Sequence, residues 1–364
     1  MPKLVFSMQG IHGKLCIVML RFGDPYSPDG VNNSIYILAE ALLKLRHEPI
    51  IVGGFSTSRE KRLHEVFDVE KVPEVQTLTK SSIRLVLWMA WFRKGTKLIR
   101  DLEPDIVISN GVIPVPKVGF RILRIHDVPK SLHQKFITKW LLRKYHYYVF
   151  SSSIIENGFL TNFRVNKNKC LIIPLPINLA LYRVRPLDKR EHAILFVDGR
   201  ERRNLRFALE VFKQVYQHND DVVMYIVGTK ETSSGDWPRG RVIFLGFVSR
   251  KELRELYSRV KLLLIPSSYE GFGYPVLEAF ASGTPVAGSD AIPSELLIDN
   301  FNGFRIHGFE AKVYAGAVLK LLRDYVLWAE MSRNALETAR RYDAVAIARK
   351  YLELYEKNQH HAKR

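Results

Sequence analysis

The chain has 364 residues, of which 47% are hydrophobic and 25% are charged, and this composition excludes a wholly disordered protein. Its 55 Lys and Arg residues outnumber its 37 Asp and Glu residues, so the net charge of +18 favours an anionic partner such as nucleic acid, a phosphorylated small molecule or an acidic membrane surface. Two cysteines exclude a disulfide framework and a zinc site built from Cys, and the longest apolar run is far shorter than the roughly 20 residues that span a bilayer. We therefore expect a cytoplasmic protein.

The first half of the chain alternates short apolar runs with helical patterns. The runs predicted to be strands are 15–20, 49–52, 105–108, 121–125 and 147–150, and the first helix is predicted over 34–45. This alternation indicates a parallel sheet that is covered by helices on both faces. The loop between the first strand and this helix has Gly30 alone rather than a glycine pair before the helix, and it has no Gly-x-Gly-x-x-Gly pattern, so a plain turn explains it as well as a phosphate-binding loop does.

A basic and apolar helix is predicted over 83–97. It combines tryptophans with arginines and lysines, and Lys135, Lys139, Arg143 and Lys144 follow in the same half of the chain. Aromatic and cationic side chains on one short helix suit the interface of an anionic membrane. The alternative is that the apolar side of the helix simply packs on the sheet. If the aromatic and cationic side chains do face a membrane, the protein would bind to its inner face.

A second series of strands and helices follows a segment, 174–190, that is rich in proline and then in charge. Such a segment predicts a linker, and we place the domain boundary near 187. The expected strands of the second series are 193–197, 222–227, 242–245, 261–265 and 285–287, and the expected helices are 205–216, 250–258 and 275–281. We predict two Rossmann-like domains, 1–187 and 188–345, that face a cleft. Parallel sheets bind ligands beyond the carboxyl ends of their strands, so those loops are where chemistry is expected.

Two glutamates flank a glycine-rich turn after the fourth strand of the second series. Gly271 and Gly273 allow the backbone to approach a ligand closely, and Pro275 fits the first turn of a helix. The N-terminus of that helix offers unpaired N–H groups to a phosphate. Glu270 precedes the helix and Glu278 lies about one turn inside it. Carboxylates beside a phosphate would repel it, so they indicate a ligand whose sugar hydroxyls donate hydrogen bonds to them. The alternative is a capped surface loop with two solvated glutamates.

The run 269–286, with its Glu-x7-Glu spacing, resembles the family 4 (group 1) retaining glycosyltransferases of the GT-B fold. The resemblance implies that Glu278 accepts hydrogen bonds from the ribose of a nucleotide sugar and that Glu270 lies against the donor sugar. It also implies that residues 346–364 form a C-terminal helix that crosses back onto the N-terminal domain. The other donor-binding residues that it implies are Gly30, Gly271, Phe272, Gly273, Tyr274, Pro275 and Val276.

Three further loops carry residues that the resemblance identifies. Arg200 and Arg203 follow the strand 193–197, and they would hold the departing diphosphate, although a solvated charge cluster also explains them. Main-chain groups near Phe247 and Val248 would hold the base, whereas core packing explains Phe247 equally well. His126 follows a strand at its carboxyl end and would contact the transferred sugar near its reacting carbon, although a lone histidine is more often structural.

These features predict an enzyme that moves a hexosyl unit from a nucleotide diphosphate sugar to a glycan, a lipid-linked acceptor or another acceptor, with retention at the anomeric carbon. No enzymatic nucleophile is evident, which favours front-face attack. The sequence has no Asp-x-Asp pattern, so we expect no metal, and we expect no cofactor besides the donor substrate. The alternatives are a non-catalytic GT-B partner subunit and a basic nucleic-acid-binding protein, although no nucleic-acid-binding motif is recognisable.

Overall fold

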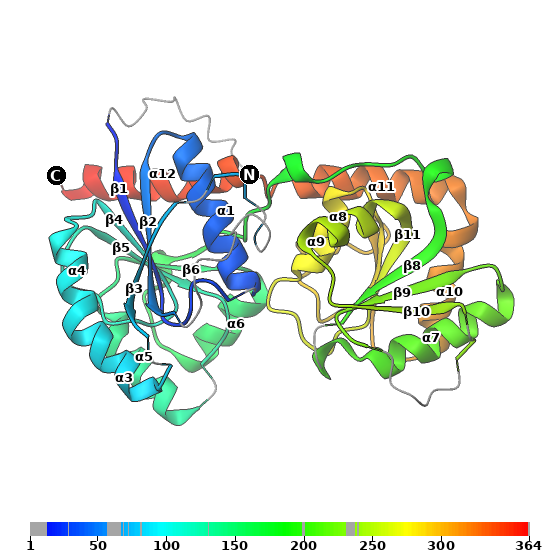
Figure 1. Cartoon of the computed structure of the whole chain (residues 1–364), viewed down its shortest axis with the longest axis horizontal. Coiled ribbons are helices and arrows are strands. Elements are labelled where there is room, and N and C mark those ends of the chain that lie inside the picture. The colour runs from blue at the N-terminus through cyan, green and yellow to red at the C-terminus, as the bar shows by residue number, and fades with distance from the viewer. Residues whose placement is uncertain are drawn as a thin grey trace.

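The computed structural model describes residues 13–27, 29–56, 67, 69–71, 73–80, 82–129, 131–198, 201–230, 237–238 and 240–362. It contains two parallel sheets, each covered by helices, in two domains that lie side by side (Figure 1). A long C-terminal helix returns to the first domain. The predicted pair of Rossmann-like domains is therefore confirmed.

The sheet of the first domain has the strand order β3-β2-β1-β4-β5-β6-β7, and every pairing is parallel. Its strands are β1 (Cys16–Arg21), β2 (Glu48–Phe55), β3 (Glu74–Thr79), β4 (Ile106–Asn110), β5 (Phe120–Ile125), β6 (Tyr147–Phe150) and β7 (Cys170–Ile172). Its helices are α1 (Gly30–Lys44), α3 (Arg84–Ala90), α4 (Thr96–Asp101), α5 (Leu132–Leu142) and α6 (Ser153–Asn162). The central strands carry apolar side chains on both faces, which explains why helices pack on both sides of the sheet.

The sheet of the second domain has the order β10-β9-β8-β11-β12-β13 and is also parallel. Its strands are β8 (Glu191–Val197), β9 (Val223–Val227), β10 (Val242–Gly246), β11 (Val260–Ile265), β12 (Val286–Ser289) and β13 (Gly303–Ile306). Its helices are α7 (Leu205–His218), α8 (Arg250–Arg259), α9 (Tyr274–Ala281), α10 (Ala311–Arg323) and α11 (Tyr325–Arg340), and α12 (Ala344–Ala362) follows them. In both sheets the order reverses next to the first strand, which is where such folds bind ligands.

The predicted linker, 174–190, packs against the second domain. The predicted boundary at 187 falls on the short 3-10 turn Leu187–Lys189, between β7 and β8. Before it, Leu175, Ile177 and Tyr182 are buried in the core of the second domain, and Ile177 forms a bridge with Asp343. The linker therefore follows the second domain closely.

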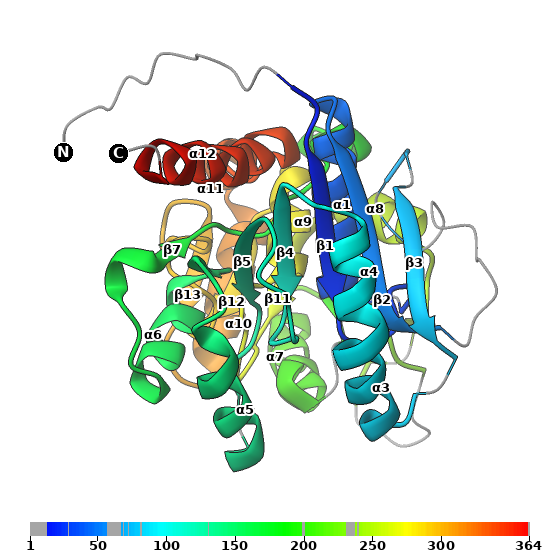
Figure 2. The same cartoon turned by 90° about the vertical axis from the view of Figure 1, so that its left-hand side faces the viewer.

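Helix α12 packs on the first domain rather than on the second. Ile347, Ala348 and Tyr351 belong to the same buried cluster as Ile35 and Leu38 of α1. Figure 2 shows α12 lying across one end of the first sheet, beside α1. The expected crossing of the C-terminal helix is therefore confirmed.

The basic helix predicted over 83–97 is present, and a π-helical turn interrupts its α-helical geometry in the middle. Helix α3 ends at Ala90, a π-helical turn occupies Trp91–Gly95, and α4 continues to Asp101. Trp91 is fully buried and donates to the carbonyl of Phe22 at 3.4 Å, so one side of the segment does pack on the domain. No helix among the described residues combines the length and the apolarity that crossing a membrane requires.

Candidate functional site

The N-terminus of α9 lies at the carboxyl end of β11, as the sequence predicted. Gly273 precedes the helix with a φ of 94°, in the left-handed region that favours glycine, and Pro275 lies in the first turn. No side chain among the described residues caps this helix. A Cβ on Gly30 would lie 3.4 Å from the ring of Tyr274, so the N-termini of α1 and α9 face each other across the two domains. The structure thus brings an uncapped helix N-terminus to the domain boundary.

Glu270 and Arg203 form an ion pair on two adjacent loops of the second domain. Arg203 Nε lies 3.2 Å from Glu270 Oε1, and only 17% of the Arg203 side chain and 13% of the Glu270 side chain are exposed. Arg203 also donates to the carbonyl of Val197 at 2.9 Å, and Ser267 donates to the same carboxylate oxygen at 3.1 Å. The two residues predicted to hold sugar and diphosphate therefore lie together and are held in place by their neighbours.

Arg202 and Arg203 have different surroundings, whereas Arg200 lies outside the described residues. The side chain of Arg202 is exposed, and its guanidinium lies over the ring of Tyr269, 5.9 Å from the centroid. Its carbonyl accepts from the backbone of Ser268 at 2.8 Å, which joins the arginine loop to the Glu270 loop. Of the two described arginines, Arg203 is the one that reaches Glu270.

Glu278 is buried and both of its oxygens are engaged. The Tyr257 hydroxyl donates to Oε2 at 2.9 Å, and Arg250 of α8 forms an ion pair with Oε1. Burial, and the Glu278 carboxylate beside it, raise the pKa of Tyr257 well above its usual value, so this phenol stays a hydrogen-bond donor. Glu278 thus links α9 to the N-terminus of α8.

The loop before α8 presents an exposed aromatic side chain. Phe247 is 88% exposed, so the alternative that it packs in the core is wrong. Gly246 precedes it with a φ of 64°, and the half-buried Val248 packs against the core. Ser249 caps α8 as the sequence predicted, with Glu252 completing the reciprocal pair of hydrogen bonds. The packing of Val248 and the cap at Ser249 therefore hold in place the loop that carries Phe247.

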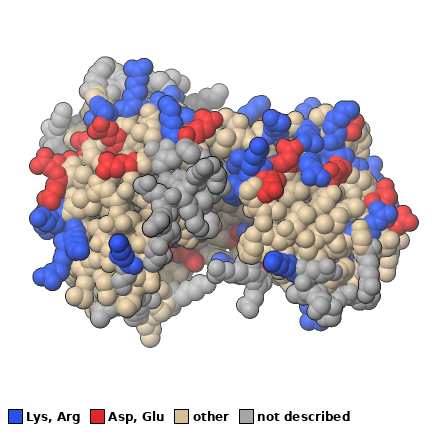
Figure 3. All heavy atoms as spheres, viewed as in Figure 1, with Lys and Arg blue, Asp and Glu red and all other residues tan. Residues whose placement is uncertain are grey.

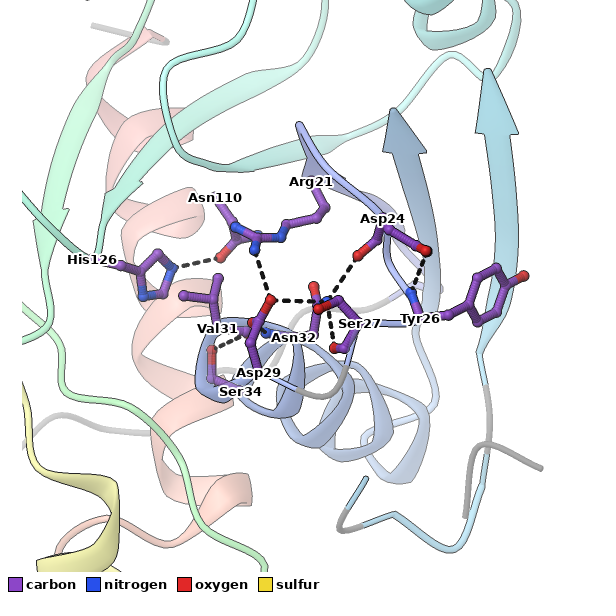
Figure 4. A network of polar contacts seen from close by, with 10 residues as sticks. All are labelled: Arg21, Asp24, Tyr26, Ser27, Asp29, Val31, Asn32, Ser34, Asn110 and His126. Atoms are coloured by element: carbon purple, nitrogen blue, oxygen red, sulfur yellow. Dashed lines mark hydrogen bonds and ion pairs between the residues drawn. The ribbon is translucent and has the colours of Figure 1, made fainter. Parts of the chain in front are cut away.

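His126 belongs to a partly buried polar network in the first domain (Figure 4). Asn110 donates through its amide to the Leu20 carbonyl at 3.3 Å, so its oxygen faces His126 Nε2 at 3.0 Å, and Nε2 must carry the proton. Burial lowers the pKa of His126 well below its usual value, and the nearby charges of Arg124 and Arg21 lower it further. The imidazole is therefore neutral at physiological pH, and its buried Nδ1 has no hydrogen-bond partner among the described residues.

A cavity of about 600 Å³ lies beside this network, at the carboxyl ends of β1, β4 and β5. The lining residues that matter here are Arg21, Val31, Asn110, His126, Gln134 and Phe159. All residues around the cavity belong to the first domain, so it is separate from the Glu270 and Glu278 pairs. Arg21 pairs with Asp29 at 2.9 Å, and Asp29 caps α1, which fixes this side of the cavity.

Contacts across the domain boundary bring His126 to the glycine-rich turn. Tyr269 donates to Asp127 at 3.0 Å, and Ser152 donates to the carbonyl of Gly271 at 2.6 Å. A Cβ on Gly271 would lie 3.3 Å from the carbonyl oxygen of His126, so only glycine fits this approach without a shift. The glycine-rich turn therefore lies next to His126 and Asp127, two residues that line the first-domain cavity.

Sequence reasoning missed three side chains that complete these clusters: Asn110, Tyr257 and Arg250. Asn110 ends β4, and its place at the carboxyl end of a parallel strand is the same signal that pointed to His126 after β5. Arg250 lies directly after the predicted cap Ser249, but nothing in the local sequence shows that it reaches Glu278. The described residues contain no group of three His, Cys, Asp or Glu side chains that could hold a metal ion.

Two family models together match most of the chain. The model described as Glycosyltransferase Family 4 matches residues 28–181, and the one described as Glycosyl transferases group 1 matches residues 182–341. The chain belongs to the family 4 (group 1) glycosyltransferases. The boundary between the two matched regions lies within the predicted linker, and the glycine-rich turn of this glycosyltransferase lies in the second region.

Curated relatives and solved structures agree with this assignment. An uncharacterised glycosyltransferase of Methanocaldococcus jannaschii is 33% identical over 32% of this chain, and the match spans only 30% of that relative's own length. Alpha-monoglucosyldiacylglycerol synthase of Streptococcus pneumoniae is 24% identical over 83% of this chain and 77% of its own. The structure of Anabaena HepE in complex with UDP-glucose is similar, with a TM-score of 0.73 at 17% identity, covering 94% of this chain and all of that one (100%). The fold is thus that of the GT-B glycosyltransferases.

Proposed function

We propose that this protein transfers a hexosyl unit from a nucleotide diphosphate sugar to a glycan or lipid-linked acceptor, with retention at the anomeric carbon and without a metal ion. The observation that carries the proposal is the meeting of the uncapped α9 N-terminus with the Arg203–Glu270 pair at the domain boundary. Helix N–H groups and a guanidinium stabilise the charge of a departing diphosphate, and such preorganised charge supplies much of an enzyme's catalysis.

The donor would lie across the carboxyl edge of the second sheet. Its base would contact the loop at Phe247, its ribose hydroxyls would reach the Glu278 carboxylate, and its diphosphate would lie between Arg203 and the α9 turn. Because Glu278 is already bound by Arg250 and Tyr257, the ribose would complete an existing network instead of neutralising a bare charge. HepE, whose structure holds UDP-glucose, offers a precedent for the class of donor.

The sugar and the acceptor would meet at His126. A neutral imidazole offers a hydrogen-bond acceptor at Nδ1 and no positive charge, so we assign His126 to holding a sugar hydroxyl rather than to stabilising an anion. The acceptor would occupy the first-domain cavity, next to that ring. Since Glu270 is committed to Arg203 and Ser267, this carboxylate is not poised as a nucleophile, which supports attack on the same face from which the diphosphate departs.

A panel of UDP, GDP and ADP sugars in a thermal-shift assay tests donor binding, and hydrolysis of the stabilising sugar tests turnover. The expected result is one nucleotide class that raises the melting temperature and is hydrolysed in the presence of EDTA. Proton NMR of the first-formed product distinguishes retention from inversion. The absence of any stabilising nucleotide sugar, together with salt-dependent DNA binding, would favour the nucleic-acid-binding alternative instead.

A further inference from the structure

Two helices of the first domain expose an unusual number of large apolar side chains. On α5, Leu132 is 87% exposed, Phe136 is 76% exposed and Trp140 is 57% exposed. On and just before α3 and its π-helical extension, Ile83, Val86, Met89 and Phe92 are also exposed. Elsewhere in the described part of the chain, exposed large apolar side chains stand singly or in pairs. These seven residues are called the α3–α5 face below.

The two sets of exposed side chains meet through one ring contact between the helices. The residues of α5 recur every four positions, so they lie along one side of that helix, and those of the other segment recur every three, so each is a surface neighbour of the next. The rings of Phe92 and Trp140, one from each segment, have their centroids 6.3 Å apart. Both helices project at the same end of the first domain, the lower end in Figures 1 and 2. Soluble domains rarely leave an apolar surface of this kind uncovered without a partner.

Within the two segments that carry the α3–α5 face, the charged side chains are all cationic. The sequence has no Asp or Glu over 82–100 or over 131–144. Exposed cationic side chains lie on both segments, namely Arg93, Lys94, Lys97, Lys139 and Arg143. Lys144 lies over the ring of Trp140, with Nζ 5.2 Å from the centroid. In the space-filling view, blue groups lie on the lower left edge of this domain, with red groups above them, and the lower end is mainly tan (Figure 3). Apolar and aromatic residues bordered by cations match the interface of an anionic bilayer.

The cavity that contains His126 lies between the same two helices. Trp88 of α3 and Gln134, Ile137 and Thr138 of α5 line it, while the exposed sides of the helices form the face. We propose that the α3–α5 face binds the surface of an anionic lipid bilayer, and that the cavity thereby receives an acceptor carried by a lipid. The second half of this proposal rests on the proposed function, whereas the first half stands on the surface alone.

Sedimentation with vesicles tests the surface directly. The full chain is mixed with vesicles of phosphatidylcholine alone or of phosphatidylcholine with phosphatidylglycerol, at low and high salt. We expect binding to the anionic vesicles that weakens with salt, together with a blue shift of tryptophan fluorescence as Trp140 enters the interface. The double variant Phe136→Ser, Trp140→Ser should bind at least tenfold more weakly, and Lys139→Gln should lose about fivefold, since one basic residue near such a surface contributes about that factor.

A matched control lies on the second domain. Tyr325 and Val326 at the start of α11 are 66% and 74% exposed, so Tyr325→Ser with Val326→Ser removes comparable apolar surface elsewhere and should leave binding unchanged. Melting temperatures equal to that of the parent in both double variants would show that neither change unfolds the protein.

Three results would overturn the proposal. The first is no preference for anionic vesicles, and the second is equal loss of binding in the control variant. The third is a dimer in sedimentation velocity that Phe136→Ser abolishes, because a second copy would then cover the face. Vesicle binding needs no sugar transfer, so it survives if the proposed function fails, while an active enzyme that ignores vesicles refutes this inference alone.

Discussion

Replacing Arg203 tests which arginine holds the diphosphate. Arg203 is largely buried, pairs with Glu270 at 3.2 Å and donates to the Val197 carbonyl at 2.9 Å, so its guanidinium is already oriented before a donor binds. We expect Arg203→Gln to lower kcat for sugar transfer strongly. A glutamine retains N–H donors but removes the charge that the leaving diphosphate would meet.

The expected loss follows from the value of one charged hydrogen bond. Such a bond contributes roughly 1.5–3 kcal/mol, which corresponds to about a 10- to 150-fold decrease in rate. Arg202→Gln is the matched control, because Arg202 is adjacent but exposed and lies over the Tyr269 ring instead. We expect this control to remain within about threefold of the parent, since an exposed cation is well screened.

The assay measures kcat and KM for the donor identified by thermal shift, with the melting temperature as a check on folding. Arg203→Gln should reduce kcat more than it raises KM, because the charge on the leaving diphosphate grows in the transition state. A parent-like kcat in Arg203→Gln beside a tenfold loss in Arg202→Gln would refute the assignment of Arg203.

Glu278→Gln should weaken nucleotide binding about tenfold and lower the melting temperature, because Arg250 loses a buried charged partner; calorimetric titration and thermal melts measure both, and unchanged affinity would exclude the ribose role. Phe247→Ser should weaken nucleotide binding by about 1 kcal/mol or more if the base stacks there, with no change in melting temperature because the ring is 88% exposed. Burial, and the neighbouring charges of Arg121 and Lys169, lower the pKa of His146 to about 4. The unfolded chain, with a His pKa of about 6.5, then binds more protons between these values, so stability should fall as the pH drops from 6.5 toward 4. His146→Asn should flatten this fall in urea denaturation by roughly 1 kcal/mol, a figure reduced because the ring is only half-buried, and an unchanged slope would contradict the linkage.

All central strands of the two sheets were predicted from the sequence, whereas β10 was the only edge strand of the described residues that was predicted. The central strands are apolar on both faces, so continuous apolar runs marked them within a few residues. The strands that the sequence did not predict are β3, β7 and β13, and each of them is an edge strand. Their sequences are short or mixed: β7 has three residues, and β3 reads Glu-Val-Gln-Thr-Leu-Thr. An edge strand is fixed by the neighbour with which it pairs, and that neighbour lies elsewhere in the sequence.

The same distinction divides the candidate site. Backbone features could be predicted, because Gly273 and Pro275 signal a helix start by their own conformational preferences. Side-chain partners could not, because Arg250 reaches Glu278 over a separation of 28 residues and Asn110 reaches His126 over 16. The sequence contains many arginines and several polar residues at the ends of predicted strands. It does not show which of these side chains contact one another in the folded protein. The burial of His126, which decides its charge, likewise depends on the folded surroundings.

The return of α12 to the first domain has a consequence for biosynthesis. The core beneath α1 includes Ile347, Ala348, Tyr351 and Leu352, so it lacks part of its lining until the ribosome has translated past those codons. Most multidomain chains complete their leading domain while the trailing one is still being made. Here the leading domain stays incomplete through the synthesis of the entire second sheet. Nascent chains of this protein should therefore depend on chaperones for longer than their modest size suggests.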